Sequence, residues 1–138
     1  MTVISLVTAN KVEIVESILQ LTLPTAEVVS PGAAARLDTS TGKLTKANGT
    51  TAPEARILGI ATGAVANIAG QPVTAIKKGV IDGYDLSGLA YDAPVYLSDT
   101  DGALDTAAGT VSTVVGRVIP GASTTLGTAF DKLLLVDL

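Results

Sequence analysis

The sequence predicts an all-β fold: a single compact β-barrel or sandwich, built from two related hairpin units, with an N-terminal strand or arm. Short runs of Val, Ile, Leu and Thr are separated, about every eight to twelve residues, by Gly, Pro, Asn or Asp, and this spacing is typical of sandwiches and barrels. Part of the chain is also repeated. The length of 138 residues suits one domain.

The repeat is a faint copy at an offset of 60 residues. The segment A-A-A-R-L-D-T-S-T-G-K-L-T-K-A-N-G-T (33–50) returns as A-P-V-Y-L-S-D-T-D-G-A-L-D-T-A-A-G-T (93–110), with seven matches in eighteen positions. After a three-residue slip 56–61 parallels 113–118, and 73–76 then falls opposite 133–136. Such self-similarity indicates one supersecondary unit used twice. We expect the two copies at about residues 28–76 and 88–136.

The first predicted element, residues 12–23, precedes the repeat. Its β-branched residues favour a strand, with a change of phase near Ser17 that puts Leu19, Leu21 and Leu23 on a shared face. A helix is the alternative, because some of its apolar residues also have helical spacing (Ile14, Ile18 and Leu21). We expect residues 1–24 to be an arm that packs on a neighbouring molecule or an edge strand, and residues 25–138 to be the β-rich domain.

Each copy then begins with a predicted hairpin whose turn ends in a glycine, Gly42 in the first and Gly102 in the second. A tight hairpin needs positive φ there, which glycine adopts without a steric penalty. The flanking leucines would then face each other across the strands: Leu37 with Leu44, and Leu97 with Leu104.

The other elements follow from composition. We expect an exposed loop at 48–55, strand-like segments at 57–66, 72–77 and 79–81, and a turn-rich connection into the second copy at 82–88. A loop of small residues is predicted at 121–129. The chain closes with residues 132–138, a run of Leu and Val suited to a buried strand.

The apolar content predicts a thin core. It reaches 47% but depends on Ala and Val, with one Phe, three Tyr and no Trp. Aromatic side chains normally supply much of the buried apolar area. Because burial between subunits can supplement a thin core, we expect a homo-oligomer.

Composition also argues against catalysis and cofactors. The chain contains no Cys and no His, which removes disulfides, thiolate metal sites, the usual base near neutral pH and the Ser-His and Cys-His nucleophile pairs. We therefore expect no enzyme, no catalytic residues and no cofactor. The net charge of −4 and the scattered basic residues argue against nucleic-acid binding.

Three charged clusters are candidate sites. Asp99, Asp101 and Asp105 resemble part of a calcium loop, but the glutamate that ends such a loop is missing, so a hairpin turn is the preferred interpretation and no metal is expected. Asp82, Asp85 and Asp92 could form an acid–base pair, but Asp beside Gly is ordinary in turns. Lys77 and Lys78 could contact an acidic partner, although a solvated pair that discourages edge aggregation is favoured.

Neither a targeting segment nor a membrane span is expected. Residues 1–8 are apolar but lack a basic leading region, and no stretch approaches the roughly 20 apolar residues of a spanning helix.

Five segments together resemble the small capsid decoration, or cement, proteins of tailed bacteriophages and prophages. They are V-V-S-P-G-A-A-A-R-L-D (28–38), I-L-G-I-A (57–61), A-G-Q-P-V-T-A-I-K-K-G-V (69–80), Y-D-A-P-V-Y-L (91–97) and V-V-G-R-V-I (114–119). The resemblance covers nearly everything from residue 28 to the C-terminus.

The resemblance implies a virion structural protein on the outer face of an assembled capsid, made in the host cytoplasm, that bridges neighbouring major capsid subunits. It implies a homo-oligomer, a trimer in preference to a dimer, and transfers no catalytic residues. The alternative is a carbohydrate- or host-surface-binding β module of a phage head or tail, for which Tyr84, Tyr91 and Tyr96 are the aromatic candidates. A small hydrolase using carboxylates is the weakest competitor, for want of a nucleophile context.

Overall fold

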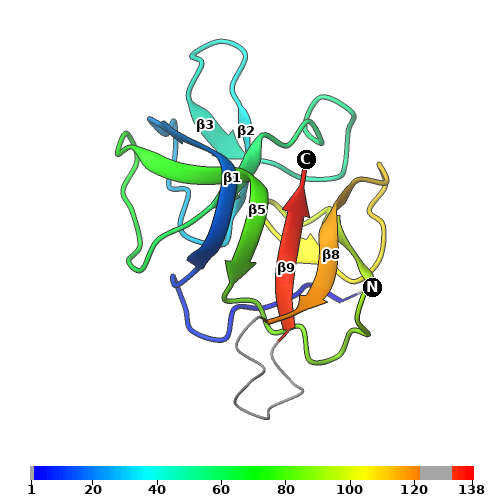
Figure 1. The fold of residues 1–138 in the computed structure, drawn as a ribbon. Coiled ribbons are helices and arrows are strands. Elements are labelled where there is room, and N and C mark those ends of the chain that lie inside the picture. The colour runs from blue at the N-terminus through cyan, green and yellow to red at the C-terminus, as the bar shows by residue number, and fades with distance from the viewer. Residues whose placement is uncertain (1, 122–131) are drawn as a thin grey trace.

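The computed structural model describes residues 2–121 and 132–138. These residues form an all-β structure without helices: one strongly curled antiparallel sheet, a half-barrel, whose strand order is β3-β2-β4-β5-β9-β8-β6-β7, with β1 paired to β5 (Figure 1). The predicted fold class is confirmed. Almost all of the predicted loop at 121–129 lies outside the described residues.

The strands are mostly short, as the frequent turn residues predicted. Their bounds are β1 Glu13–Leu23, β2 Ala34–Leu37, β3 Leu44–Lys46, β4 Gly59–Ala61, β5 Val73–Asp82, β6 Pro94–Leu97, β7 Leu104–Asp105, β8 Val114–Pro120 and β9 Lys132–Asp137.

The two hairpin units are related in three dimensions as well as in sequence. Two pairings of the first hairpin, between β2 and β3, recur 60 residues later in the second hairpin, between β6 and β7. Arg36↔Thr45 corresponds to Tyr96↔Asp105, and Leu37↔Leu44 corresponds to Leu97↔Leu104. The next strand is also equivalent, with Ala34↔Ile60 and Ala35↔Gly59 corresponding to Pro94↔Arg117 and Val95↔Gly116. Its residues lie 57 positions apart, because the three-residue slip of the repeat falls between the hairpin and this strand. The predicted leucine pairs are thus confirmed.

Both hairpin glycines adopt the predicted conformation, with φ of 70° at Gly42 and 75° at Gly102. Their surroundings differ. A Cβ on Gly42 would meet nothing within 4 Å, whereas one on Gly102 would meet the side chain of Lys46 at 3.1 Å. The first turn therefore projects freely, and the second packs against the first unit.

The strand predicted for the first element is confirmed, and the helical alternative is wrong. β1 is antiparallel to β5 over its whole length, from Glu13↔Asp82 to Leu23↔Val73, and both strands bend together in Figure 1. The register shifts between Ile14 and Glu16 and between Ser17 and Leu19, which is where a change of phase was predicted. Pairing with β5 makes β1 an edge strand of its own molecule.

The following segments are strands as predicted, but their predicted extents were wrong. The strand expected over 57–66 covers only Gly59–Ala61. Beyond it the chain stops pairing with β5, because Gly63 exchanges backbone hydrogen bonds with Val12 (2.8 and 3.0 Å). The strands expected at 72–77 and 79–81 form one strand, β5. Lys77 and Lys78 therefore lie within this strand and not at its end.

β5 joins the two units because it offers a different partner to each. On the edge opposite β1, its first half pairs with β4 (Ile60↔Ile76) and its second half pairs with β9 (Ile81↔Leu134). β9 is thus a central strand between β5 and β8, and its Leu134 and Val136 are fully buried, as the closing run of Leu and Val predicted.

Apolar side chains cover both faces of the first unit. Alternate residues of β2, β4 and β5 enter a main core (Ala34, Ile60 and Ile76) that also holds most buried residues of the second unit. Their neighbours Ala35, Ala61 and Ala75 enter a second, smaller cluster with Val29, Leu44 and Val73. Half of this second cluster is alanine, so it contains little apolar volume.

The contact between β1 and the bend of β5 depends on Gly79. Its φ is +153°, and a Cβ there would overlap the Glu16 carbonyl oxygen and lie 2.7 Å from Ile76 Cδ1. Backbone atoms cannot move aside as a flexible side chain can. We therefore expect Gly79→Ala to lower the free energy of unfolding by about 3 kcal/mol or more, measured by chemical denaturation.

Gly88→Ala is the matched control, because Gly88 has no positive φ and a methyl group added there would meet nothing within 4 Å. Its expected effect is within about 0.5 kcal/mol. Equal effects of the two substitutions would contradict the packing of β1 on β5.

Candidate functional site

The aspartates of the predicted turn at 99–105 point to separate partners. Asp99 accepts hydrogen bonds from the Thr110 amide (2.9 Å) and hydroxyl (2.8 Å). Asp105 is buried and accepts from the amides of Thr2 (2.9 Å) and Ala107 (3.1 Å). In the described part of the chain no group of three or more acidic side chains could hold a metal ion. These carboxylates fasten loops.

The three carboxylates that could have served acid–base chemistry have different partners. Asp92 forms an ion pair with Arg117 (3.0 Å). Asp85 accepts hydrogen bonds from the hydroxyl (2.6 Å) and amide (3.2 Å) of Ser87, and these bonds lower its pKa. Asp82 ends β5 opposite Glu13. Asp82 and Asp85 line one shallow cavity, and Asp92 is not among its lining residues.

The lysine pair is divided between two roles within β5. The Lys78 ammonium forms an ion pair with Asp137 of the neighbouring strand β9 (3.2 Å). The Lys77 carbonyl accepts a hydrogen bond from the Leu138 amide (3.2 Å). Both residues therefore help to hold β9 against β5, which the sequence did not indicate.

The three tyrosines differ in exposure, and Tyr96, in β6, is partly buried. Tyr84 is 5% exposed and its hydroxyl donates to the Gly32 carbonyl; burial raises its pKa. Tyr91 is 44% exposed, with the Lys132 ammonium 5.1 Å from its ring centre. Tyr84 is thus removed from the aromatic candidates for glycan binding.

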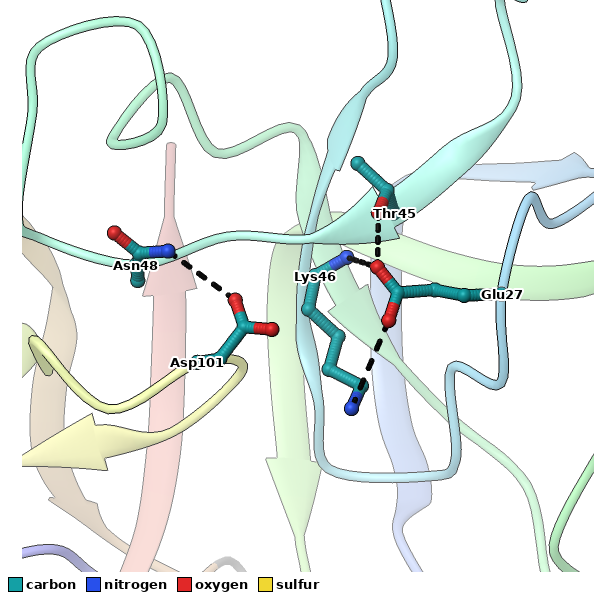
Figure 2. Close-up of polar contacts among 5 residues, drawn as sticks. All are labelled: Glu27, Thr45, Lys46, Asn48 and Asp101. Carbon is teal, nitrogen blue, oxygen red and sulfur yellow. Dashed lines mark hydrogen bonds and ion pairs between the residues drawn. The ribbon is translucent and has the colours of Figure 1, made fainter.

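The two units meet where the second hairpin turn packs against the end of β3. The Ala34 amide donates to the Gly102 carbonyl (2.9 Å), and the Gly102 amide donates to the Ala47 carbonyl (2.7 Å). Beside this backbone pair, the Asn48 side-chain amide donates to Asp101 (3.2 Å), as Figure 2 shows. These contacts fix the position of one unit on the other.

Glu27 fastens the segment after β1 to the same strand, β3. Its carboxylate accepts hydrogen bonds from the Thr45 hydroxyl and the Lys46 amide, and the Lys46 ammonium lies 3.8 Å away (Figure 2). Partial burial opposes ionisation of Glu27, but these bonds and the charges of Lys46 and Arg36 outweigh it, so its pKa is lowered.

A surface without charge is the feature most suited to binding. Residues 17–26 and 57–76 contain none of the 9 basic and 13 acidic residues of the chain. Strand pairing brings these segments together, as in Leu23↔Val73, and the Gly70 amide donates to the Thr25 carbonyl (3.0 Å). We call the surface formed by the exposed residues within 17–26 and 57–76 the uncharged face. It includes the left-hand ends of β1 and β5 and the loop that precedes β5 in Figure 1.

The uncharged face exposes large apolar side chains. Val65 is 76% exposed, Ile68 69%, Ile18 72% and Leu19 43%. Exposed apolar side chains that gather on one surface mark interaction sites, and the centres of protein interfaces are depleted of charged residues. Val65 and Ile68 lie in one loop, whereas Leu19 is paired with Lys78 of β5. The loop is therefore the part of the face most suited to binding. This arrangement is suited to binding another protein.

The sequence contained a signal for this face that was overlooked. Two charge-free segments are visible in the chain, but only the β1–β5 register and the Gly70–Thr25 contact show that they are neighbours.

Comparisons with protein-family models, with curated proteins and with solved structures found no match. The structure contains no helix, within the residues it describes, that is long and apolar enough to cross a membrane.

The lowered pKa of Glu27 predicts a pH-dependent contribution to stability. A carboxyl whose pKa falls on folding stabilises the fold above its unfolded value, here 4.5, and loses that contribution as the pH drops through the folded value. Because the side chain is 41% exposed, the contribution is at most about 1 kcal/mol. Glu27→Gln should be less stable than the wild type at pH 7, and the difference should shrink below pH 4.5.

Chemical denaturation at a series of pH values measures this difference. Thr45→Val is the control background, because it removes the hydroxyl donor, and there the Glu27→Gln effect should be smaller. A difference that stays constant between neutral and acidic pH would show that the carboxylate bonds do not stabilise the fold.

Proposed function

We propose that this protein is a non-enzymatic virion structural protein that binds the outer surface of an assembled phage capsid and stabilises it by bridging neighbouring major capsid subunits. The observation that carries the proposal is the uncharged face, an exposed apolar surface on an acidic β domain. The resemblance of five segments to capsid decoration proteins is the reason for naming the major capsid protein as the partner of this face.

The physical requirement on such a protein is a preference for the assembled shell. A ligand that binds the closed lattice better than free subunits shifts the equilibrium toward the lattice. Each copy needs to contribute only a few kcal/mol, because an oligomer engages several sites at once. The acidic net charge of −4 suits the exterior, because packaged DNA inside the shell would repel it.

The proposal includes a homo-oligomer as the working form and excludes nucleic acid, membranes and cofactors as partners. The alternative of a carbohydrate- or host-surface-binding module has less support, because Tyr84 is buried and such sites usually present several exposed aromatic rings.

Sedimentation with undecorated capsids tests the function. The protein should co-sediment with shells and should not bind free major capsid subunits. Equal binding to both would contradict the clamp mechanism, and retention on a glycan array without shell binding would favour the alternative.

The uncharged face predicts which substitutions weaken shell binding. Val65→Asp with Ile68→Asp puts two charges on an exposed loop without disturbing the core, and we expect affinity for shells to fall at least tenfold, about 1.4 kcal/mol. Val7→Asp is the control, because Val7 is 73% exposed but lies outside the face, and it should change affinity less than twofold. Similar losses for both variants would show that the face is not the contact.

A further inference from the structure

The outer edge of β1 is the one strand edge left without a backbone partner among the described residues. β5 is paired on both edges. The edge of β3 is covered by the segment after β1, through Ala26 to Leu44 (2.8 Å), and that of β7 by the N-terminal segment, through Ile4 to Leu104 (2.9 Å). Only β1 can add a strand from another molecule.

The two halves of this edge differ in their protection. Charged side chains and bulges discourage edge-to-edge pairing, and the first half of β1 has both, with Glu13, Glu16 and the register shifts around Val15 and Ile18. From Leu19 to Leu23 there is no charge, and the one remaining shift leaves out Lys77 of β5, not a residue of β1.

The unprotected half also carries an apolar row. Leu21 and Leu23 pair with Ala75 and Val73 of the second, smaller core cluster, and Leu23 packs against that cluster. Leu19 precedes them at the same alternation and is 43% exposed. A strand added here would cover the row and extend a cluster that is itself poor in apolar volume.

We propose that residues 19–23 of β1 pair with the same residues of a second copy, antiparallel and centred on Leu21. The apolar row favours a second copy because it is symmetric about Leu21: the pairing places Leu21 beside Leu21, and Leu19 beside Leu23 of the other copy. Two molecules of net charge −4 repel each other, and residues 19–23 add nothing to that repulsion because they carry no charge. Charge selects the direction of the pairing. A parallel pair would oppose Glu13 and Glu16 to their own copies, whereas the antiparallel pair places each Glu16 opposite residue 26, beyond the end of the partner strand.

This inference rests on the proposed function only in that a capsid clamp acts as an oligomer, and it specifies the oligomer. Because the same edge serves both copies, the contact is isologous and closes with two molecules. The edge pairing therefore predicts a two-fold dimer, whereas the resemblance to capsid decoration proteins favours a trimer.

The register can be tested by charge exchange. Centring on Leu21 puts Gln20 of each copy opposite Thr22 of the other, and both side chains are exposed. A variant with Gln20→Glu and Thr22→Glu, and a second with Gln20→Lys and Thr22→Lys, oppose like charges in their own dimers and opposite charges when mixed. Thr39→Glu with Ser40→Glu is the control, in the exposed turn of the first hairpin.

Sedimentation equilibrium of the full chain should give twice the mass of one chain for the wild type and the control, one chain for each variant alone, and a restored dimer for their equimolar mixture. A wild-type monomer or trimer, variants that remain dimeric, or a mixture that stays monomeric would each overturn the proposal. If a variant does not fold, wild-type hydrogen exchange decides: amides of residues 19–23 should gain protection as concentration rises, and unchanged exchange there would overturn the pairing.

Shell sedimentation separates the two proposals. Each monomeric variant should bind shells more weakly than the wild type, and the equimolar mixture, which restores the dimer, should restore shell binding. Because residues 20 and 22 also belong to the uncharged face, weak binding that persists in the dimeric mixture would show that the dimer is not the working form. A wild-type dimer that ignores shells would refute the capsid function while the pairing itself stands.

Discussion

The sharing of β5 between two hairpin units is the constraint on which the rest of the structure depends. One edge of this strand is occupied by β1, and the other is divided between β4 and β9. A single strand can serve both units only if it bends, and at the bend Gly79 admits the backbone of β1 where a side chain would collide with it. The half-barrel is therefore one cooperative sheet and not two hairpins in sequence.

In the same arrangement, the two similar units expose different parts of their hairpins and different side chains. The turn of the second hairpin is used internally, because Gly102 bonds to Ala34 and Ala47, while the turn at Gly42 remains exposed. β1 covers β5 and so brings one charge-free segment beside another. An acidic protein thereby acquires a charge-free surface at one end, and the proposed shell contact uses this asymmetry.

Much of the fold could be predicted from the sequence because hairpin chemistry is local. Gly42 and Gly102 specified their turns, and the 60-residue offset specified equivalent registers for the two hairpins. The continuity of β5 through Lys77 and Lys78 was missed, because the ion pair of Lys78 with Asp137 needs a strand far away in sequence. The end of β4 at Ala61 was missed for the same reason, because the hydrogen bonds between Gly63 and Val12 join segments far apart in sequence. The candidate face was missed for the same reason: each charge-free segment is visible alone, but their adjacency depends on sheet register.

The central claim is that the loop at 62–72 of the uncharged face is buried against the shell in the assembled particle. Hydrogen exchange, compared between the free protein and the protein bound to capsids, tests it most directly because it locates the contact without substitutions. The account predicts slower exchange of backbone amides in the loop at 62–72 on binding, with no change in the exposed turn at 38–43. Protection of that turn, with unchanged exchange in the loop, would contradict the account.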